Sequence, residues 1–206
     1  MKTIFIAMTD ISYGDKGPRS ARAADAREAV GLRGDVFWGI NGKQLGLQSD
    51  RLYTLDGLPG THLKPKIVGT WLSHRALWAA CLLLPDNEFL LLEDDAVFPT
   101  DWAQRTHRVL KDVPPDWDFI NLGPCCAADK SKIHVNGEIY MIPEAMCLHA
   151  YYVTRKGLTT LIKTQDAIGC AEPIDISVSR HSFPQMKAYA VFPRIAEQLD
   201  MEDLVR

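Results

Sequence analysis

The sequence predicts an α/β fold in which a central, mostly parallel sheet is flanked by helices. Short apolar runs of strand length alternate with longer segments of helix-forming residues. The chain opens with a strand, a helix and a strand, which implies a parallel pair joined by a right-handed crossover. No linker rich in Pro, Gly or Ser divides the 206 residues, and 47% of them are hydrophobic. We therefore expect one domain over residues 1–206.

The opening unit consists of a strand at residues 4–7, a polar loop at residues 9–20, a helix at about residues 20–29 and a strand at residues 35–40. Because ligands of open α/β sheets bind at the carboxyl ends of the strands, the loop after the first strand is a candidate binding segment. Two arginines near the start of the helix can reach a diphosphate, with a solvated helix face as the alternative: Arg19 and Arg22.

A run of strong helix formers predicts a largely buried helix that begins at Thr70, as N-cap, and ends at Pro85. Ser73 and His74 lie near its predicted amino end, and the amino terminus of a helix attracts phosphate. The alternative is that Ser73 bonds to the backbone and that His74 is a satisfied, partly buried side chain.

The densest concentration of charge follows an apolar run at residues 89–92, which predicts a strand buried on both faces. Glu93, Asp94 and Asp95 should emerge at the carboxyl end of this strand. Adjacent carboxylates repel one another by about 1 kcal/mol per close pair in water and by more in a shielded crevice. Mg²⁺ or Mn²⁺ would relieve this repulsion and leave room for a phosphate. A solvated acidic turn is the alternative.

The remaining chain predicts further helices and strands around these acids. Tyr151 and Tyr152 are candidates for stacking on a base or a sugar, although one of them is expected in the core. Asp175 is a lone carboxylate after a turn. The predicted elements are a helix capped by Thr100, a strand at 117–123, a segment of lid length at 124–137, strands at 138–142 and 147–154, a helix at 156–163 and a strand at 188–192.

Composition narrows the classes of partner. The 23 basic and 26 acidic residues give no electrostatic footprint for nucleic acid and no polybasic membrane patch. The apolar runs at residues 4–8 and 77–84 are too short for a signal peptide and a membrane span, respectively. Five cysteines without C-x-x-C spacing suggest free thiols in a reducing cytosol, with a redox-active Cys125–Cys126 pair as the alternative. We expect a cytoplasmic location.

Several motifs, taken in order, resemble glycosyltransferase family 25, which includes lipooligosaccharide galactosyltransferases and collagen galactosyltransferase domains. Met8 and Thr9 replace the Asn-Leu usual after the family's first strand, and Thr70 replaces its usual Cys. The matching motifs are Gly69-x-x-x-Ser73-His74, Leu91-Leu92-Glu93-Asp94-Asp95-Ala96, Trp117-Asp118-Phe119-Ile120-Asn121-Leu122-Gly123, His149-Ala150-Tyr151, Thr154-Arg155-Lys156-Gly157, Pro173-Ile174-Asp175, and Pro193 followed by Gln198.

The resemblance implies a GT-A-type, Rossmann-like fold and an inverting hexosyltransferase that uses a nucleotide sugar, usually a UDP-hexose such as UDP-galactose or UDP-glucose. Asp175 is the first candidate for the catalytic base and Asp118 the second. The expected ligands of Mn²⁺ or Mg²⁺ are Asp95, Glu93 and His149. The expected donor-binding residues are Thr9, Arg19, Arg22, Ser73, His74, Glu93 and Asp94.

The acceptor is expected to be a glycan or glycolipid, as in lipopolysaccharide biosynthesis. A protein or a modified nucleobase is an alternative acceptor, and the acidic net charge weighs against DNA. Two other classes of function remain open. Paired carboxylates also serve glycoside hydrolases, and the departure at Thr9 leaves room for a catalytically degenerate protein that only binds the nucleotide sugar.

Overall fold

The computed structural model of the chain describes residues 1–7, 25, 28–45, 64–125 and 133–198. The predicted loop at residues 9–20 and most of the helix predicted at about residues 20–29 lie outside these ranges. No described helix is both long enough and apolar enough to cross a membrane.

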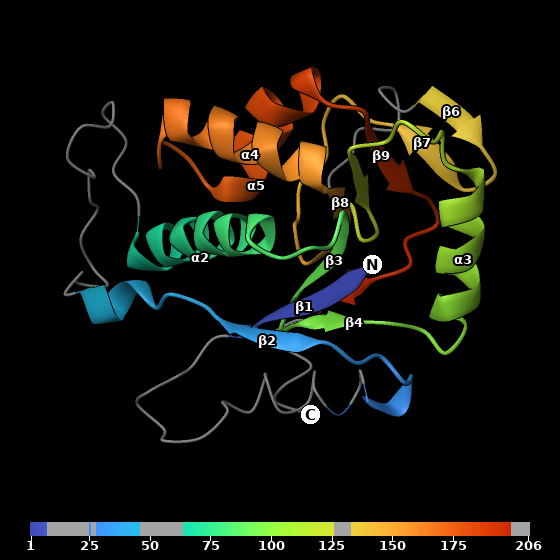
Figure 1. The fold of residues 1–206 in the computed structure, drawn as a ribbon, viewed down its shortest axis with the longest axis horizontal. Helices are drawn as coiled ribbons and strands as arrows, with labels where there is room; N and C mark the ends of the chain where they lie inside the picture. The colour runs from blue at the N-terminus through green and yellow to red at the C-terminus, as the bar shows by residue number, and fades with distance from the viewer. Residues whose placement is uncertain (8–24, 26–27, 46–63, 126–132, 199–206) are drawn as a thin grey trace.

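The main sheet has eight strands in the order β2-β1-β3-β8-β5-β9-β7-β6 (Figure 1). The pairings of β1 with β2 and β3, and of β5 with β9, are parallel, whereas β7 and β8 run against their neighbours. The predicted α/β fold with a mostly parallel sheet is therefore confirmed. The strands are β1 (Lys2–Ala7), β2 (Asp35–Trp38), β3 (Glu88–Glu93), β5 (Phe119–Asn121), β6 (Ile133–Asn136), β7 (Ile139–Met141), β8 (Ala150–Thr154) and β9 (Ala188–Val191), with a separate pair formed by β4 (Ala96–Val97) and β10 (Glu197–Gln198).

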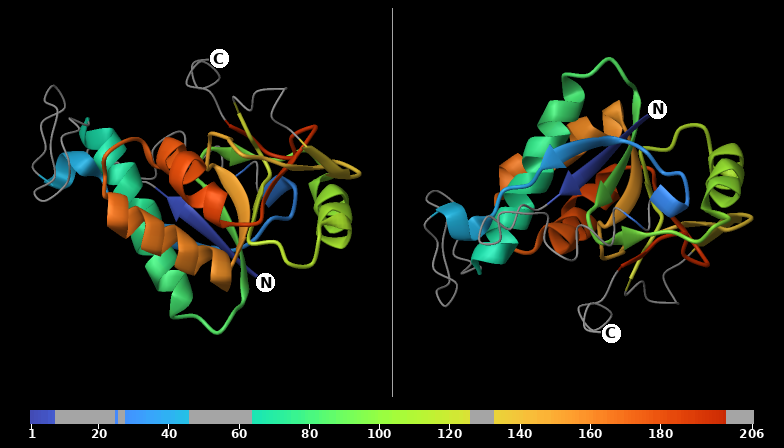
Figure 2. Two further views of the ribbon diagram at one scale, coloured as in Figure 1. Left: turned by 90° about the horizontal axis from the view of Figure 1, so that it is seen from above. Right: turned by 90° about the horizontal axis from the view of Figure 1, so that it is seen from below.

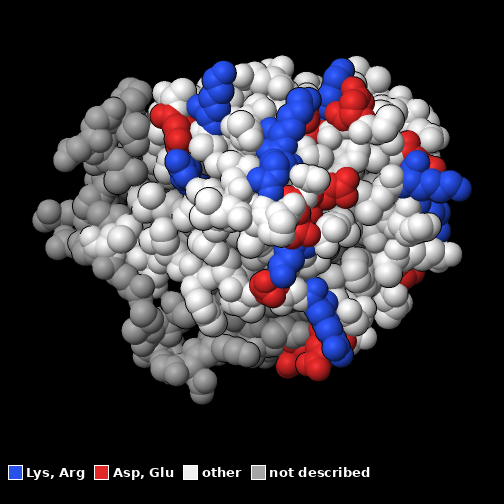
Figure 3. All heavy atoms as spheres, viewed as in Figure 1, with Lys and Arg blue, Asp and Glu red and all other residues white. Residues whose placement is uncertain are grey.

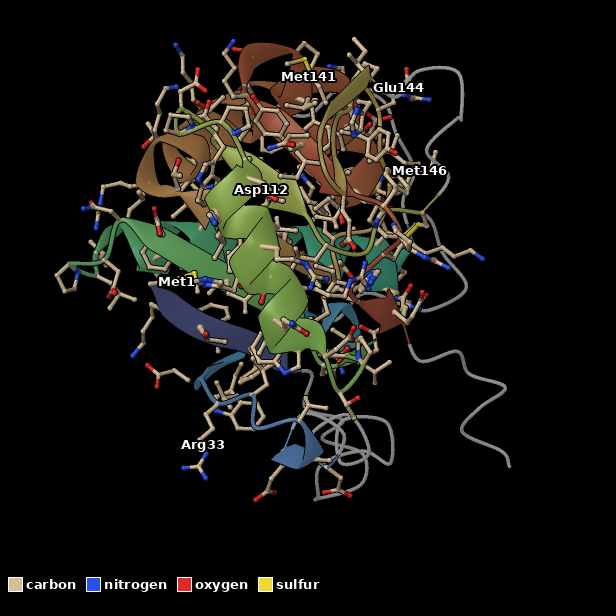
Figure 4. All side chains as sticks on the ribbon, turned by 90° about the vertical axis from the view of Figure 1, so that its right-hand side faces the viewer. Met1, Arg33, Asp112, Met141, Glu144 and Met146 are labelled. Atoms are coloured by element: carbon tan, nitrogen blue, oxygen red, sulfur yellow. A yellow bond between two sulfur atoms is a disulfide. The ribbon has the colours of Figure 1, made fainter. Side chains whose placement is uncertain are left out.

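Helices cover both faces of the main sheet (Figures 1 and 2). On one face, α2 and α4 pack over the strands together with the short helices that follow α4. On the other face, α3 packs over the strands, and Figure 4 looks onto this helix, with Asp112 labelled at its carboxyl end. The helical elements are η2 (Gly42–Leu45), α2 (Pro65–Leu82), α3 (Trp102–Asp112), α4 (Arg155–Ile168), α5 (Ile174–Ser177), η3 (Val178–Ser182) and η4 (Phe183–Gln185).

Strand β3 lies between the two cores, as its continuous apolar sequence predicted. Phe89 and Leu91 belong to the core beneath α2 and α4, and Leu90 and Leu92 to the core beneath α3. All four side chains are at most 1% exposed. Successive side chains of a strand point to opposite faces, so only an apolar run can supply both cores. The chain thus becomes polar at Glu93, where the strand ends.

The N-cap of helix α2 lies six residues earlier than predicted, at Lys64 and not at Thr70. Lys64 is extended and occupies the N-cap position, and Pro65 is the first helical residue, where a missing N–H costs nothing. The predicted cap Thr70 instead lies inside the helix and donates from Oγ1 to the carbonyl of Lys66. The cap predicted at Thr100 is also wrong, because Asp101 occupies that position of α3.

The other end of α2 is held by Arg155, the first residue of α4. Its guanidinium donates to the carbonyl oxygens of Leu82, Leu84 and Asp86, which lie in the turn between α2 and β3. The carbonyl groups at the end of a helix lack partners within the helix, and a cation that donates several hydrogen bonds satisfies them. Arg155 therefore fixes the start of β3 relative to α2.

The segment of lid length expected at residues 124–137 contains strand β6, which forms an antiparallel hairpin with the edge-proximal strand β7, and its residues 126–132 lie outside the described ranges. The expectation that a tyrosine of β8 stacks on a ligand is wrong. Tyr151 and Tyr152 are at most 1% exposed and belong to the two cores, so neither is placed to stack on a ligand in this structure.

Candidate active site

The carboxyl end of β3 and the amino end of β8 lie side by side. Here, the edge of the sheet means the side at which these central strands end, and not an outermost strand. The backbone N–H of Glu93 donates to the carbonyl of His149 over 2.8 Å. Strand β5 reaches the same level, because Asn121 and Leu91 both pair with Tyr151 of β8. The structure therefore brings Glu93 and His149 together at the sheet edge where α/β proteins bind ligands.

The three consecutive acids differ in burial. The Glu93 side chain is 23% exposed, whereas Asp94 is 6% exposed and Asp95 is fully buried. Asp95 Oδ2 accepts a hydrogen bond of 2.6 Å from Gln198 Nε2. The pairing of β4 with β10 supports this contact, since Gln198 lies directly opposite Ala96. Sequence reasoning included Gln198 only as part of a family motif and did not predict that it holds an acid.

The Glu93 carboxylate contacts His74 from α2, with 2.9 Å between Oε1 and His74 Nε2. Because α2 begins at Pro65, His74 and Ser73 lie inside the helix, and the expectation that its amino terminus presents them to phosphate is wrong. Ser73 Oγ donates to the carbonyl of Gly69 and accepts from the N–H of Ile40, which is the alternative that we considered. His74 is 1% exposed and reaches the site through Glu93.

His149 is 2% exposed and packs against Gly123. A Cβ atom at position 123 would lie 2.1 Å from His149 Nε2, so only glycine fits there. The same ring nitrogen lies 3.4 Å from the carbonyl oxygen of Ala196. Burial lowers the pKa of His149 below its usual value of 6.5, so the imidazole is neutral at pH 7. Nδ1 has no hydrogen-bond partner among the described residues.

Asp175 reaches the same edge of the sheet through Cys147. Its Oδ2 accepts from the N–H of Cys147 over 3.3 Å, and its Oδ1 accepts from the N–H of Ile176 over 2.9 Å. The carbonyl of Cys147 in turn accepts from Asn121 Nδ2, at the carboxyl end of β5. Asn121, a buried amide that sequence reasoning did not single out, thus connects β5 to the segment that orients Asp175.

A disulfide joins Cys147 to Cys125, with 5.7 Å between the Cα atoms. The expectation of free thiols is therefore wrong for these two residues, while Cys81 and Cys170 are free and buried. Cys126 lies outside the described part of the chain. Disulfides are rare in the cytosol, so this bond removes the support that unpaired cysteines gave to a cytoplasmic location.

Asp118, the second candidate base, lies at the opposite end of the sheet. It precedes β5, and its carbonyl accepts from the N–H of Thr154, at the far end of β8 from His149. Its carboxylate binds Lys156 Nζ and the N–H of Lys187. The structure therefore does not bring Asp118 to Glu93, and its contacts fix the starts of α4 and β9.

Three predicted donor-binding residues, Thr9, Arg19 and Arg22, lie outside the described residues. Within the described ranges, no three His, Cys, Asp or Glu side chains converge as a cation site. On the face shown in Figure 3, Lys and Arg side chains lie beside Asp and Glu side chains, so the described part of that face has no large area of a single charge.

The fold is shared with solved structures of low sequence identity. A UDP-glucose pyrophosphorylase complexed with UDP-glucose matches with a TM-score of 0.51 and 12% identity, covering 99% of this chain and 95% of that one. A glycosyltransferase involved in glycosylation of the major capsid of PBCV-1 matches with a TM-score of 0.50 and 10% identity, covering 94% and 82%. At these identities the likeness defines the fold class alone.

The chain belongs to glycosyltransferase family 25. The family model, described as glycosyltransferase family 25 (LPS biosynthesis protein), matches residues 35–178. This range contains the acid triplet, His149 and Asp175. The family membership expected from the motifs is therefore confirmed.

Two curated relatives extend this comparison. A glycosyltransferase 25 family member of Anopheles gambiae is 27% identical over 67% of this chain, and an inactive glycosyltransferase 25 family member 3 of Mus musculus is 24% identical over 87%. The chain spans only 25% and 33% of these relatives' lengths.

Proposed function

We propose that this chain transfers a hexose, galactose or glucose, from a UDP-sugar to a hydroxyl group of a glycan or glycolipid, with inversion at the anomeric carbon. The observation that carries the proposal is the meeting of the acid triplet, His149 and Asp175 at one edge of the sheet. Membership of a glycosyltransferase family supports the reaction class. The choice of a glycan or glycolipid as acceptor is based on the family description, which reads LPS biosynthesis protein.

The donor diphosphate would bind at Glu93, the most exposed of the three acids, together with a divalent cation. Carboxylate oxygens and a neutral imidazole are suitable ligands for Mn²⁺, and His149 has a buried nitrogen without a partner among the described residues. Mg²⁺ is commonly held by one or two carboxylates together with substrate phosphates. Because Glu93, Asp95 and His149 do not converge as a three-ligand site in the described structure, one or two of them would hold the cation, and its remaining ligands would come from the donor and water.

The cation would supply Lewis acidity, which stabilises the negative charge that develops on the leaving diphosphate. Asp94 would bond hydroxyl groups of the sugar or ribose. The carboxylate of Asp175 would take the proton of the acceptor hydroxyl as its oxygen attacks the anomeric carbon. The bond from that carbon to the donor phosphate breaks with its electron pair going to UDP, and attack from the opposite side inverts the configuration.

A thermal-shift screen with UDP-glucose and UDP-galactose, with Mn²⁺ or with EDTA, tests donor binding. A ligand at 100 times its Kd stabilises the folded state by about 2.7 kcal/mol, which corresponds to a Tm increase of roughly 5–10 °C for a chain of this size. We expect this increase with Mn²⁺ and its loss with EDTA. If neither sugar raises Tm under any condition, the proposed donor class is wrong.

A catalytically degenerate binding protein is the second candidate, because the mouse relative is described as inactive. Release of UDP, measured with the donor that binds best and with a panel of glycan acceptors, separates the two. We expect UDP release from the wild type and none from Asp175→Asn, with donor binding retained in both. Binding without UDP release in the wild type would favour the degenerate protein.

A further inference from the structure

Three buried side chains from α2 and β8 connect the core to the Glu93 carboxylate. Trp78 Nε1 lies 2.8 Å from the Tyr151 hydroxyl, that hydroxyl lies 3.1 Å from His74 Nδ1, and His74 Nε2 lies 2.9 Å from Glu93 Oε1. Trp78, Tyr151 and His74 are each at most 1% exposed. The chain of hydrogen bonds is therefore shielded from water until it reaches Glu93.

The direction of each hydrogen bond follows from the chemistry of the groups. An indole N–H can only donate, so the Tyr151 hydroxyl accepts from Trp78. Burial raises the pKa of Tyr151 well above its usual range, so the hydroxyl keeps its hydrogen. A buried hydroxyl hydrogen without an acceptor is costly, and His74 Nδ1 is in place to accept it. The imidazole hydrogen of His74 is then on Nε2, from which it donates to Glu93.

The backbone that carries His74 is also fixed. Ser73 bonds to Gly69 within α2 and to Ile40 after β2. A Cβ atom at Gly69 would lie 2.6 Å from the backbone of both Ile40 and Gly42, so the glycine permits the close approach of α2 to this segment. The Gly69-x-x-x-Ser73-His74 motif therefore sets both the position of the helix and the orientation of the imidazole.

We propose that His74 is a positioning residue, locked with its hydrogen on Nε2 by Tyr151 and Trp78, that holds the Glu93 carboxylate in its donor-binding orientation. This inference rests on the proposed function for the role of Glu93. A hydrogen-bonding partner that orients a metal- or ligand-binding group commonly contributes 10- to 100-fold to affinity or activity. His74 acts through Glu93 and is not expected to touch the substrate.

Nitrogen NMR of the ¹⁵N-labelled protein tests whether Tyr151 fixes the tautomer of His74, and this measurement does not depend on activity. We expect His74 to carry its hydrogen on Nε2 in the wild type and to lose this fixed tautomer in Tyr151→Phe. Tyr152→Phe is the matched control, because Tyr152 is the neighbouring buried tyrosine on β8 and faces the other core. A His74 hydrogen on Nδ1 in the wild type, or an equal response to both tyrosine variants, would overturn the proposal.

Titration with UDP-glucose and UDP-galactose in the presence of Mn²⁺ tests the positioning role. We expect His74→Phe to weaken binding by about 10- to 100-fold. His74→Gln should restore most of it, because the glutamine amide can still donate to Glu93. Equal affinity of His74→Phe and the wild type would contradict the role, as would a His74→Gln protein that folds but binds no better than His74→Phe.

If the wild type binds neither sugar nucleotide, the proposed donor is wrong. The positioning role of His74 is then tested by its hydrogen bond to Glu93 alone. The His74 Nε2 proton signal should then shift in Glu93→Ala and not in Glu88→Ala, which removes an exposed acid at the other end of β3. An unchanged signal in Glu93→Ala would refute the contact.

Discussion

Replacing Gln198 by alanine tests how the carboxyl-terminal strand supports the acid triplet. Gln198 donates to a carboxylate oxygen of the fully buried Asp95 over 2.6 Å. Hydrogen bonds to charged groups contribute about 1.5–3 kcal/mol to stability. The backbone pairing of β10 with β4 does not depend on the side chain. We therefore expect Gln198→Ala to lower the free energy of unfolding by about 2 kcal/mol.

Urea denaturation at pH 7 measures this loss, and an unchanged m-value would show that the variant exposes as much surface on unfolding as the wild type does. For a chain of this size, the loss corresponds to a decrease in Tm of roughly 4–8 °C. Glu197→Ala is the matched control, because Glu197 is the exposed neighbour on β10 and pairs only at the surface, with Arg194 at 3.1 Å. Such surface pairs contribute about 0–1 kcal/mol.

A double-mutant cycle with Asp95→Asn isolates the contact. The loss caused by Gln198→Ala should be smaller by about 1 kcal/mol in the Asp95→Asn background, because the amide acceptor is uncharged. If Gln198→Ala and Glu197→Ala have the same small effect, or if the two changes at positions 95 and 198 are additive, Gln198 does not hold Asp95 in solution.

Three further predictions concern the surroundings of the site. Gly123→Ala should destabilise the fold by about 1–3 kcal/mol in urea denaturation, because the added methyl group overlaps the His149 ring; wild-type stability would contradict this packing. Because the pKa of His149 is lowered by burial, the unfolded state takes up a proton that the folded state does not as the pH falls below about 6.5. Stability should therefore be unaffected by this group above pH 7 and decrease from pH 6.5 to 5, and a decrease equally steep in His149→Gln would exclude His149 as its source. The cysteines of the Cys125–Cys147 disulfide are 22 residues apart, and reduction by dithiothreitol should lower the free energy of unfolding by about 3 kcal/mol. The same reagent should leave the Tm of a Cys125→Ala/Cys147→Ala protein unchanged.

The features that could be predicted from the sequence depend on residues that are close together in the chain. The four apolar residues before Glu93 can supply two cores only as a central strand, so both β3 and the position of the acids at its end followed from the order of the residues. The parallel pairing of β1 with β2 followed from the crossover rule. Asp175 was predicted as a site residue from a motif, and the structure places its carboxylate beside Cys147, two residues before His149.

The features that were missed depend on contacts between distant parts of the chain. Gln198 and Asp95 are 103 residues apart, and no periodicity connects them. The pairing of Cys125 with Cys147 likewise depends on two loops that meet only in the folded protein. Asp118 is different, because its place directly before β5 already assigns it to the amino end of that strand. Strand direction alone would have separated it from the acids at the carboxyl end of β3.

In the proposed function, the carboxyl end of β3 binds a nucleotide-sugar donor together with a divalent cation. Calorimetric titration of UDP-glucose and UDP-galactose with Mn²⁺ into the wild type, Glu93→Gln and Glu88→Gln tests it most directly, because the two variants make the same chemical change at opposite ends of one strand. We expect Mn²⁺-dependent binding to the wild type and to Glu88→Gln, and at least a tenfold loss of affinity, about 1.4 kcal/mol, in Glu93→Gln. Equal affinity of Glu93→Gln and the wild type, or equal losses in the two variants, would contradict it.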